Sequence, residues 1–590
     1  MGTPENRIKD LVGLRKLIRF LKPYQKQVIL GPIFKLIEAI FELIVPIVTA
    51  KIIDDGIRRG DVTYVWKMGL VLLLLGAVGL CSTLVCQKMA AVASQGSGTV
   101  LRNEMFQHIN TLSHAEIDRF GTPSLITRLT NDINQLQLAV AMLIRLVVRA
   151  PFLAIGAVVM AMTIDVKLAL IFVVATPLIA LALYLVMSRS VPYFREIQKR
   201  LDVISLISRE SLSGVRVIRA FSRQKKETQR FVRAAEDQAQ TAVRVGKLSA
   251  LLNPVTFVIV NLSILAIVWF GGYRAEIGAV TQGQIVALVN YMNQTFLALV
   301  VVANLVVIFT KASASAARVN EVLETESSIK EGDSVPEPVP GAPKIEFRNV
   351  SFSYHQNGEY ALRDCSVKIA SGDTIGIIGG TGSGKSTLVN LIPRFYDVSE
   401  GRLLLDGVDV KEYPFAVLRT RVGMVPQQSE LFSGTICSNL KWGNESAKEE
   451  ELWKALKTAQ AEDFVRALPQ GLSSPVSQGG KNFSGGQRQR LTIARTVAGK
   501  PQVLILDDSS SALDFATDAA LRHALKQETE HMTVLIVSQR VSSIRHADRI
   551  IVLEDGTVAG IGTHEDLVKR CPVYQEICLS QMNREEVANQ

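Results

Sequence analysis

Long apolar runs fill the first half of the chain and constrain its fold more than any other feature. Six of them lie at about 27–50, 65–88, 139–163, 167–188, 250–272 and 284–310. Each is close to the ~20 residues that a helix needs to cross the hydrocarbon core of a bilayer. Buried helices of a soluble protein are the alternative, but so many runs in so short a stretch favour membrane spans. The sequence therefore predicts a membrane α-helical domain with six transmembrane helices.

The basic residues give these spans an orientation. Lys and Arg are concentrated in residues 1–26 and 189–247, whereas the short turns between spans on the other side hold few. Basic loops stay on the cytoplasmic side of a membrane. We therefore expect a multi-pass protein of the cell membrane (inner or plasma), with the N-terminus and the second half of the chain in the cytoplasm. The connections at about 89–138 and 189–249 are helical in pattern, so the spans should continue beyond the bilayer.

Changes in composition divide the chain into four segments. Residues 1–26 are amphipathic and basic, which is typical of an elbow helix lying on the inner membrane surface. The six-span domain with its long cytoplasmic loops follows at 27–325. A proline-rich stretch predicts a linker at 326–343, because Pro breaks helices. Short β-branched runs between glycine turns then predict an α/β domain with a largely parallel sheet over 344–590.

The net charge of +10 does not indicate nucleic acid as a partner. The basic excess lies in the loops assigned to the cytoplasm, so membrane topology explains it. The six cysteines form no metal-ligand spacing and are expected to be free thiols in a reducing compartment. The expected surroundings are therefore a lipid bilayer, with no nucleic acid.

A phosphate-binding pattern, G-x-x-x-x-G-K-[ST], follows the strand-like run TIGIIG and precedes the helix-like run STLVNLIPRF. Its glycines let backbone N–H groups turn toward phosphate oxygens at a positive helix N-terminus. Lys385 is expected to reach the β- and γ-phosphates of ATP, and the Ser386 hydroxyl to bind Mg²⁺. The predicted ATP-binding residues here are Gly379, Gly380, Thr381, Gly382, Ser383, Gly384, Lys385, Ser386 and Thr387.

Two further elements belong to this chemistry. The apolar run VLIL ends in Asp507, and an acid at that point can hold the Mg²⁺ shell. A second helix opens with Ser484, Gly485, Gly486 and Gln487. Ser484 is a plausible N-cap, and the glycines expose N–H groups at another positive helix end. One nucleotide does not need two helix ends from one domain, so this element is expected to serve the ATP of another subunit.

The order GGTGSGKS, VPQQ, NFSGGQRQR, VLILDD, SALD resembles the ATP-binding cassette (ABC) domain over about 344–580. Six spans before one cassette resemble an ABC exporter half-transporter. The resemblance implies that two cassettes sandwich two ATP molecules, each between one chain's phosphate loop and the other chain's SGGQ. It also implies that Tyr354 stacks on adenine and that Gln427 contacts Mg²⁺ and senses the membrane domain. Asp514 would lie at the dimer interface.

The same resemblance extends to the cytoplasmic loops. Ser113–Asp132 and Gly214–Phe231 resemble the segments whose short helices dock on the cassettes of exporters. They would transmit closure of the cassettes to the membrane domain, which would turn from inward-open to outward-open.

Two residues depart from the family pattern in a way that changes the expected mechanism. Asp508 stands where the family usually has the Glu that orients or deprotonates the attacking water, and a displacement of ~1 Å can cost on the order of 10²-fold in rate. Gln539 stands where the family usually has a His on the γ-phosphate, and Gln cannot become a cation or relay a proton. A further departure is Gln478, where homodimeric exporters tend to have Glu. We predict tight ATP binding with slow turnover.

An intact signature beside a weakened site predicts a heterodimer. A homodimer would have two impaired sites, whereas a second half-transporter with the catalytic Glu and the switch His would restore one good site. The pattern resembles the heterodimeric bacterial multidrug exporters, which implies export of small amphiphilic compounds. A lipid or peptide exporter of the same architecture, or an ATP-gated regulator or channel, are the alternatives.

Charged residues inside the spans predict a polar site in the membrane. Glu38 and Glu42 lie on one face of the first span, and Arg145 and Arg149 repeat that spacing in the third. Buried charges are costly in lipid, so they should face the bundle interior. They could attract cationic substrates to a cavity, or they could pair structurally with one another or with Lys35.

Overall fold

The computed structural model describes residues 16–354, 358–509, 513–528 and 532–581. They form two compact units, Met1–Asn110 with Thr122–Thr325 and Thr111–Gly121 with Glu326–Gln590. The predicted surface helix within residues 1–26 therefore lies mostly outside the described residues. The described part of that segment is helical from residue 16 onward.

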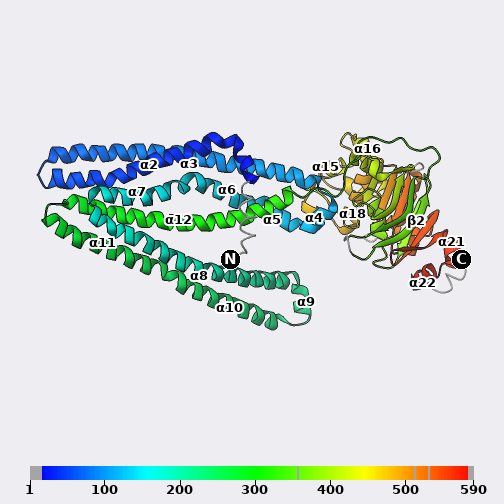
Figure 1. Cartoon of the computed structure of the whole chain (residues 1–590). Helices are drawn as coiled ribbons and strands as arrows, with labels where there is room; N and C mark the ends of the chain where they lie inside the picture. The colour runs from blue at the N-terminus through cyan, green and yellow to red at the C-terminus, as the bar shows by residue number, and fades with distance from the viewer. Residues whose placement is uncertain (1–15, 355–357, 510–512, 529–531, 582–590) are drawn as a thin grey trace. The chain divides into compact units, whose positions relative to one another are not determined.

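The first unit is a bundle of long helices lying side by side (Figure 1). Its elements are η1 (Ile18–Tyr24), α2 (Gln25–Lys51), η2 (Ile52–Ile57), α3 (Val62–Thr111), α5 (Thr122–Thr127), η3 (Arg128–Asp132), α6 (Ile133–Met142), η4 (Leu143–Val147), α7 (Arg149–Ile164), α8 (Val166–Ser213), α9 (Val215–Ala220), α10 (Gln224–Ala250), α11 (Leu252–Glu276) and α12 (Gln282–Leu323). The short segments η2, η3 and η4 are π-helical turns: η2 follows the first predicted span, η3 precedes the third, and η4 lies within the third.

Among the residues that the structure describes, five helical stretches are long and apolar enough to cross a membrane, where the sequence predicted six spans. They are Val62–Thr111, Thr122–Ile164, Val166–Ser213, Gln224–Glu276 and Gln282–Leu323. The remaining predicted span lies in α2, whose 27 residues are sufficient in length. Lys35, Glu38 and Glu42 lie in the middle of α2, so any stretch of spanning length within this helix contains these three charged side chains.

The helices extend far beyond the thickness of a bilayer, as predicted. Helix α3 has 50 residues and α8 has 48, and at about 1.5 Å per residue each is more than twice the ~30 Å of the hydrocarbon core. Close packing in the bundle comes from small side chains. One buried stripe of α7 consists of Ala150, Ala154, Ala157 and Ala161. Small residues at this spacing let neighbouring helices approach closely without help from water.

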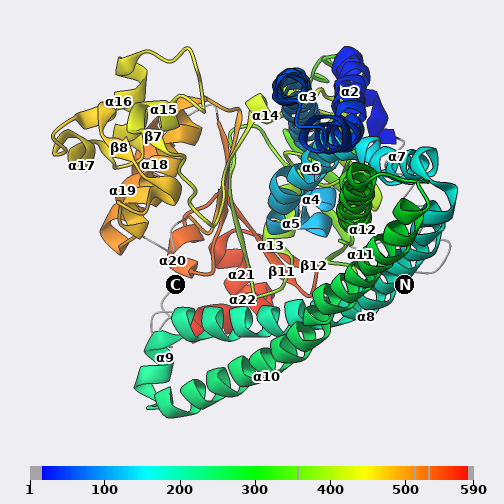
Figure 2. The same ribbon diagram turned by 90° about the vertical axis from the view of Figure 1, so that its left-hand side faces the viewer.

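Two of the long helices form an antiparallel hairpin with a short helix at its tip. Helices α8 and α10 pack along each other, and α9 joins them (Figure 2). No residue of α9 is buried within the described chain. The predicted docking segment Gly214–Phe231 contains this helix.

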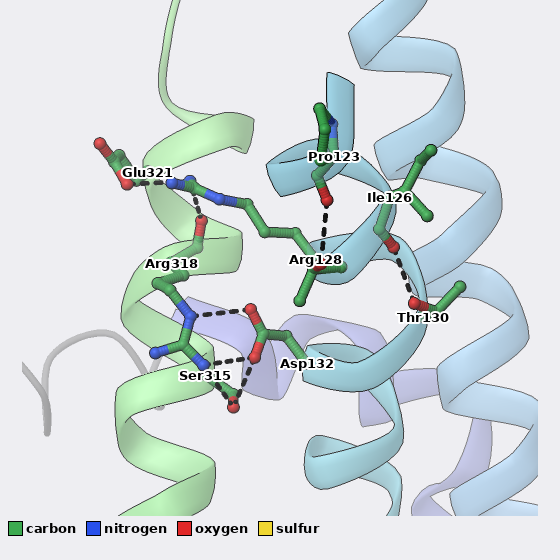
Figure 3. Close-up of polar contacts among 9 residues, drawn as sticks. Pro123, Ile126, Arg128, Thr130, Asp132, Ser315, Arg318 and Glu321 are labelled. Atoms are coloured by element: carbon green, nitrogen blue, oxygen red, sulfur yellow. Dashed lines mark hydrogen bonds and ion pairs between the residues drawn. The ribbon is translucent and has the colours of Figure 1, made fainter. Parts of the chain in front are cut away.

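A polar cluster joins the third span to α12 in the part predicted to be cytoplasmic (Figure 3). Asp132 is buried, and it accepts hydrogen bonds from Ser315 Oγ at 2.9 Å and Arg318 Nε at 2.8 Å. One turn earlier, Arg128 forms an ion pair of 2.8 Å with Glu321. These contacts tie the π-helical turn η3 to α12.

The second unit is an α/β domain, as predicted. Its strands are β1 (Ile345–Phe352), β2 (Leu362–Ile369), β3 (Thr374–Gly379), β4 (Glu400–Leu405), β5 (Val408–Asp409), β6 (Val422–Val425), β7 (Gly434–Thr435), β8 (Pro475–Val476), β9 (Val503–Asp507), β10 (Thr533–Val537), β11 (Arg549–Glu554) and β12 (Thr557–Gly562). Its helices of four residues or more are α4 (His114–Phe120), α13 (Lys385–Leu391), α14 (Phe415–Arg421), α15 (Ile436–Leu440), α16 (Glu449–Thr458), α17 (Glu462–Arg466), α18 (Gly485–Ala498), α19 (Phe515–Glu528), α20 (Val541–Ile544), α21 (His564–Arg570) and α22 (Pro572–Gln581).

The central sheet has the strand order β12-β11-β3-β10-β9-β6, and all but β12 run parallel. The middle strands β9 and β10 are buried along their whole length, which explains their continuous runs of Val, Leu and Ile. A second sheet, β2-β1-β4-β5, is antiparallel and was not predicted. The parallel order matters for function, because the carboxyl ends of its strands meet at one edge.

Candidate ATP-binding site

The carboxyl edge of the parallel sheet brings together four segments that lie far apart in the sequence. In the ladder, Val537 of β10 pairs with Asp507 of β9 and with Ile377 of β3. The phosphate loop leaves β3 at this edge, Gln539 follows β10, and Gln427 follows β6. Ligands of open parallel sheets bind in this position, beyond the carboxyl ends of the strands.

Two glycines allow the phosphate loop to turn. Gly382 and Gly384 have φ angles of +83° and +93°, which favour residues without a Cβ. At Gly384 a Cβ would also lie 2.7 Å from the carbonyl oxygen of Ala361. Helix α13 begins immediately after it, so the loop's N–H groups and the helix N-terminus face the same space.

Lys385 is buried and folds back over the loop. Its Nζ donates to the carbonyl oxygens of Gly379 at 3.0 Å and Gly380 at 2.7 Å. Burial lowers the pKa of Lys385, while the nearby carboxylates of Asp508 and Asp507 act to raise it. A cation held beside a glycine-rich loop is suited to bind a polyphosphate.

The oxygen atoms that could hold Mg²⁺ lie beside the loop. Ser386 Oγ donates to Asp507 Oδ1 at 3.1 Å, and Asp507 is only 4% exposed. Burial raises the pKa of Asp507, and the hydrogen bond from Ser386 opposes that rise. A hydroxyl, a carboxylate and the amide oxygen of Gln427 are hard oxygen donors, so these residues fit the preference of Mg²⁺.

Asp508 lies next to this donor set in a constrained backbone. Its φ is +46°, in the left-handed region, and its N–H donates to the carbonyl oxygen of Val537 at 3.0 Å. Burial raises the pKa of Asp508, whereas Lys385, Arg540 and a hydrogen bond from Gln427 lower it. The short carboxylate is thus held by Gln427 near the sheet edge.

Gln539 is exposed at the end of β10. Its carbonyl oxygen accepts a hydrogen bond from Gln581 Nε2 at 2.7 Å, which fixes the backbone of this segment against the C-terminal helix α22. Gln478 is also exposed, in a short turn before the second helix start.

Tyr354 lies beside the phosphate loop with part of its ring open to solvent. Its hydroxyl is 3.0 Å from Thr387 Oγ1, and the residue is 46% exposed. The Phe352 ring packs edge-on against it at 4.8 Å between centroids. An anchored aromatic ring with a free face next to a phosphate loop can stack on a nucleotide base.

The second predicted phosphate-binding element is a capped helix start. Ser484 and Gln487 form a reciprocal capping box at the start of α18, with hydrogen bonds of 3.3 and 2.9 Å. A Cβ on Gly485 would meet nothing within 4 Å, so this surface is open. Gly486 follows within the first turn. Asp514, in the described part of the SALD segment, accepts hydrogen bonds from Thr517, which lower its pKa.

The four charged residues predicted for the membrane cavity form ion pairs in part. Arg149 pairs with Glu42 at 2.6 Å and lies 3.9 Å from Glu38. Lys35 pairs with Glu38 at 2.5 Å. Within the described residues, Nε of Arg145 is buried without a hydrogen-bond partner. Of the two interpretations given above, a cavity for cations or structural ion pairs, the structure contains the ion pairs, with Lys35 among them.

Residues of this region that sequence reasoning missed include Tyr396 and Asp118. The Tyr396 hydroxyl donates to Asp118 Oδ2 at 2.8 Å across 278 positions in the sequence. Asp118 lies in the predicted docking segment Ser113–Asp132, but neither residue had been singled out, and Tyr396 belongs to no motif used above. A pairing over such a separation leaves no local signal in one sequence.

Comparisons with known proteins agree with this geometry. Residues 28–299 match the family described as the ABC transporter transmembrane region, and residues 362–511 match the family described as ABC transporter. An ABC transporter ATP-binding protein of Mycobacterium tuberculosis is 38% identical over 572 residues, which cover 96% of this chain and 98% of the relative. The solved structure of a bacterial Atm1-family ABC exporter with ATP bound is 25% identical with a TM-score of 0.78, covering 94% of this chain and 98% of that one.

Other relatives carry names that state a substrate. YgaD of Bacillus subtilis, named for multidrug export, is 31% identical and the match covers 96% of this chain and 98% of YgaD. An ATP-dependent lipid A-core flippase of Chromohalobacter salexigens is also 31% identical, over 95% of this chain and 96% of the flippase.

Proposed function

Because this chain belongs to the ABC exporter family, we propose that it is one subunit of a heterodimeric exporter of small amphiphilic compounds, and that its own ATP site binds nucleotide but hydrolyses it slowly. The chain would lie in the cell membrane with its N-terminus and cassette in the cytoplasm. ATP binding and hydrolysis by the pair of cassettes would drive export.

The observation that carries this proposal is the position of Asp508. Its short carboxylate is held by Gln427 and faces Lys385 and Arg540. A general base must reach the water that attacks the γ-phosphate, and a loss of ~1 Å in reach can cost on the order of 10²-fold in rate. Gln539 can donate a hydrogen bond to a γ-phosphate oxygen but cannot supply positive charge. The residues that would bind ATP are therefore present, whereas Asp508 and Gln539, the two residues that would act on the transferring phosphoryl group, are weaker than the usual Glu and His.

The binding role falls to the residues of the phosphate loop. Lys385 would leave the loop carbonyls and neutralise the β- and γ-phosphates. Ser386, Asp507 and Gln427 would hold Mg²⁺, which when bound supplies positive charge between the phosphate oxygens. Tyr354 would hold the adenine.

The capped start of α18 supports a role in a partner's site. Ser484–Gln487 presents N–H groups at a helix end, a ready anion site that this chain's own nucleotide does not require. It would complete the site of a second half-transporter that keeps the catalytic Glu and the switch His. Asp514 would lie at the interface between the two cassettes.

An apolar pocket supports an amphiphilic substrate. An open apolar groove of about 540 Å³ between α7, α8 and α12 is lined by residues such as Ile155, Val159, Met162 and Leu299. This volume suits a drug-sized molecule. The ion pairs of Glu38 and Glu42 favour a structural role for these acids over direct capture of cations. A lipid exporter is the second candidate, because the same apolar lining would hold an acyl chain; a peptide exporter and an ATP-gated regulator or channel are further alternatives.

Co-purification tests the assembly. A tagged copy expressed in its native host should recover a second half-transporter with Glu and His at the two positions, and amphiphilic drugs should stimulate ATP hydrolysis by the pair. Lipid stimulation without drug stimulation would favour the lipid exporter. Recovery of the chain only with copies of itself, with ordinary ATP turnover, would contradict the proposal.

A further inference from the structure

Helix α4, which precedes the third span in the sequence, is packed on the cassette. The His114 ring stacks on Phe395 with centroids 4.5 Å apart, and Asp118 accepts the hydrogen bond of 2.8 Å from Tyr396. At the start of α4, the Ser113 hydroxyl lies 3.1 Å from that of Ser328. For this reason residues Thr111–Gly121 belong to the same compact unit as the cassette.

The two aromatic residues that contact α4 come shortly after the helix of the phosphate loop. Tyr396 also packs edge-on against Tyr354, with centroids 5.2 Å apart and an interplanar angle of 85°. Tyr354 in turn bonds to Thr387, which follows Lys385 and Ser386. Asp118, Tyr396, Tyr354 and Thr387 thus form an unbroken series of contacts from α4 to the phosphate loop.

Tyr354, in the middle of this series, is the residue that a bound base would contact. Tyr354 is half-exposed, and its hydroxyl is its link to the loop. An edge-on contact between two rings depends on their angle, so a base that stacks on Tyr354 must shift the packing of Tyr396. Burial and the hydrogen bond to Asp118 raise the pKa of Tyr396, which keeps its hydroxyl a neutral donor.

We propose that Tyr396 and Asp118 are positioning residues for the nucleotide base: they set the Tyr354 ring, and through the same contacts they report base occupancy to α4 of the same chain. The proposal rests on the proposed function, that this site binds ATP. The signal needs neither hydrolysis nor closure on a partner cassette. A site that binds ATP but hydrolyses it slowly could therefore still send this signal.

Hydrogen exchange on the full-length chain in lipid nanodiscs tests the proposal with two probes. AMP-PNP with Mg²⁺ carries both base and phosphates, whereas tripolyphosphate with Mg²⁺ carries phosphates alone. At saturating concentration both should slow exchange in α13. Only AMP-PNP should change exchange in α4, because only the base reaches Tyr354.

Matched variants separate signalling from folding. Tyr396→Phe keeps the ring but removes the hydroxyl, so α13 should still be protected by AMP-PNP, with a rise in Kd of no more than about tenfold for one lost hydrogen bond. The response of α4 should disappear. Asp118→Asn keeps an acceptor oxygen and should keep the response. Tyr360→Phe is the control, since Tyr360 makes a similar bond of 2.9 Å to Glu400 on the same domain.

The outcomes distinguish the two ideas. An α4 response in Tyr396→Phe equal to that of the unaltered chain would overturn the proposal, as would an equal response to tripolyphosphate. If AMP-PNP does not slow hydrogen exchange in α13, the site does not bind ATP. That result would contradict the proposed function and also the proposed signal from Tyr354 to α4.

Discussion

At the scale of single residues, the proposal that this site binds ATP but hydrolyses it slowly rests on two side chains, Asp508 and Gln539. Lys385, Ser386 and Asp507, the residues proposed to bind the polyphosphate and Mg²⁺, lie at the carboxyl edge of the parallel sheet. Asp508 and Gln539 lie at the same edge but with a shorter carboxylate and no imidazole. We therefore expect ATP hydrolysis, the step after binding, to be slow. Changing only these two residues should make it faster.

Asp508→Glu combined with Gln539→His should raise ATP hydrolysis at this site by about 10- to 100-fold, since the double variant restores reach and positive charge. Phosphate release from the assembled complex at saturating ATP measures the gain. Asp508→Asn, which cannot act as a base, is the matched control and should show no gain. If the double variant is no faster than the unaltered complex, the impairment claim is wrong.

The residues of this site could be predicted because each signal is local. The phosphate loop needs only its glycines, Lys385 and the strand before it, and Asp507 needs only a buried strand that ends in an acid. The contact between Asp118 and Tyr396 could not be predicted, because its partners are 278 positions apart. The choice between a cavity and ion pairs for Glu42 also needed the structure, which places Arg149 at 2.6 Å.

At the scale of elements, the third span is attached to its neighbours by polar contacts at its π-helical turns. Asp132 at the end of η3 bonds to Ser315 and Arg318 of α12, and its side chain is 5% exposed. These contacts attach η3 to α12. The turns themselves carried no sequence signal, because a π-helical turn differs from an α-helix by one residue in its hydrogen bonding.

Asp132→Ala should lower the free energy of unfolding of the membrane unit by about 1 to 3 kcal/mol, because it leaves the buried Ser315 hydroxyl without its acceptor and removes the ion pair with Arg318. The midpoint of thermal unfolding in nanodiscs should fall accordingly. Glu321→Ala is the control: that carboxylate is 56% exposed, and an exposed ion pair contributes at most about 1 kcal/mol. Equal shifts for both variants would argue against a special role for Asp132.

Docking of α4 should weaken in acid. Desolvation against Phe395, and then the nearby Arg419, lower the pKa of His114 from its ordinary 6.5, while Asp118 opposes the shift. The undocked segment therefore binds more protons than the docked one, so docking stability rises with pH. It should be complete above pH 6.5 and be lost as the pH falls through the lowered value.

Hydrogen exchange of α4 between pH 7.5 and 5.5, corrected for intrinsic rates, measures this effect. His114→Phe keeps the stacked ring and should remove the excess exchange in acid. A docked α4 with the same protection at both ends of this range would contradict the assignment.

At the scale of the whole molecule, this ABC exporter chain combines one membrane unit with one cassette. The strands followed from runs of Val, Leu and Ile, and the spans followed from apolar length, except that α2 carries three charges in the middle of the first predicted span. Only the resemblance of Ser113–Asp132 to docking segments predicted that α4 packs on the cassette; composition carried no signal for it, because tertiary contacts place α4 there.

The central claim is that this chain's own site binds ATP tightly and hydrolyses it slowly. Single-turnover hydrolysis of γ-labelled ATP, measured together with equilibrium ATP binding on the full-length chain assembled only with itself, tests the claim directly. We predict stoichiometric binding of ATP and Mg²⁺ with nearly all label still in ATP after the Asp508→Glu, Gln539→His variant has released its phosphate. Release of labelled phosphate at the same rate by the unaltered chain and by that variant would contradict the claim.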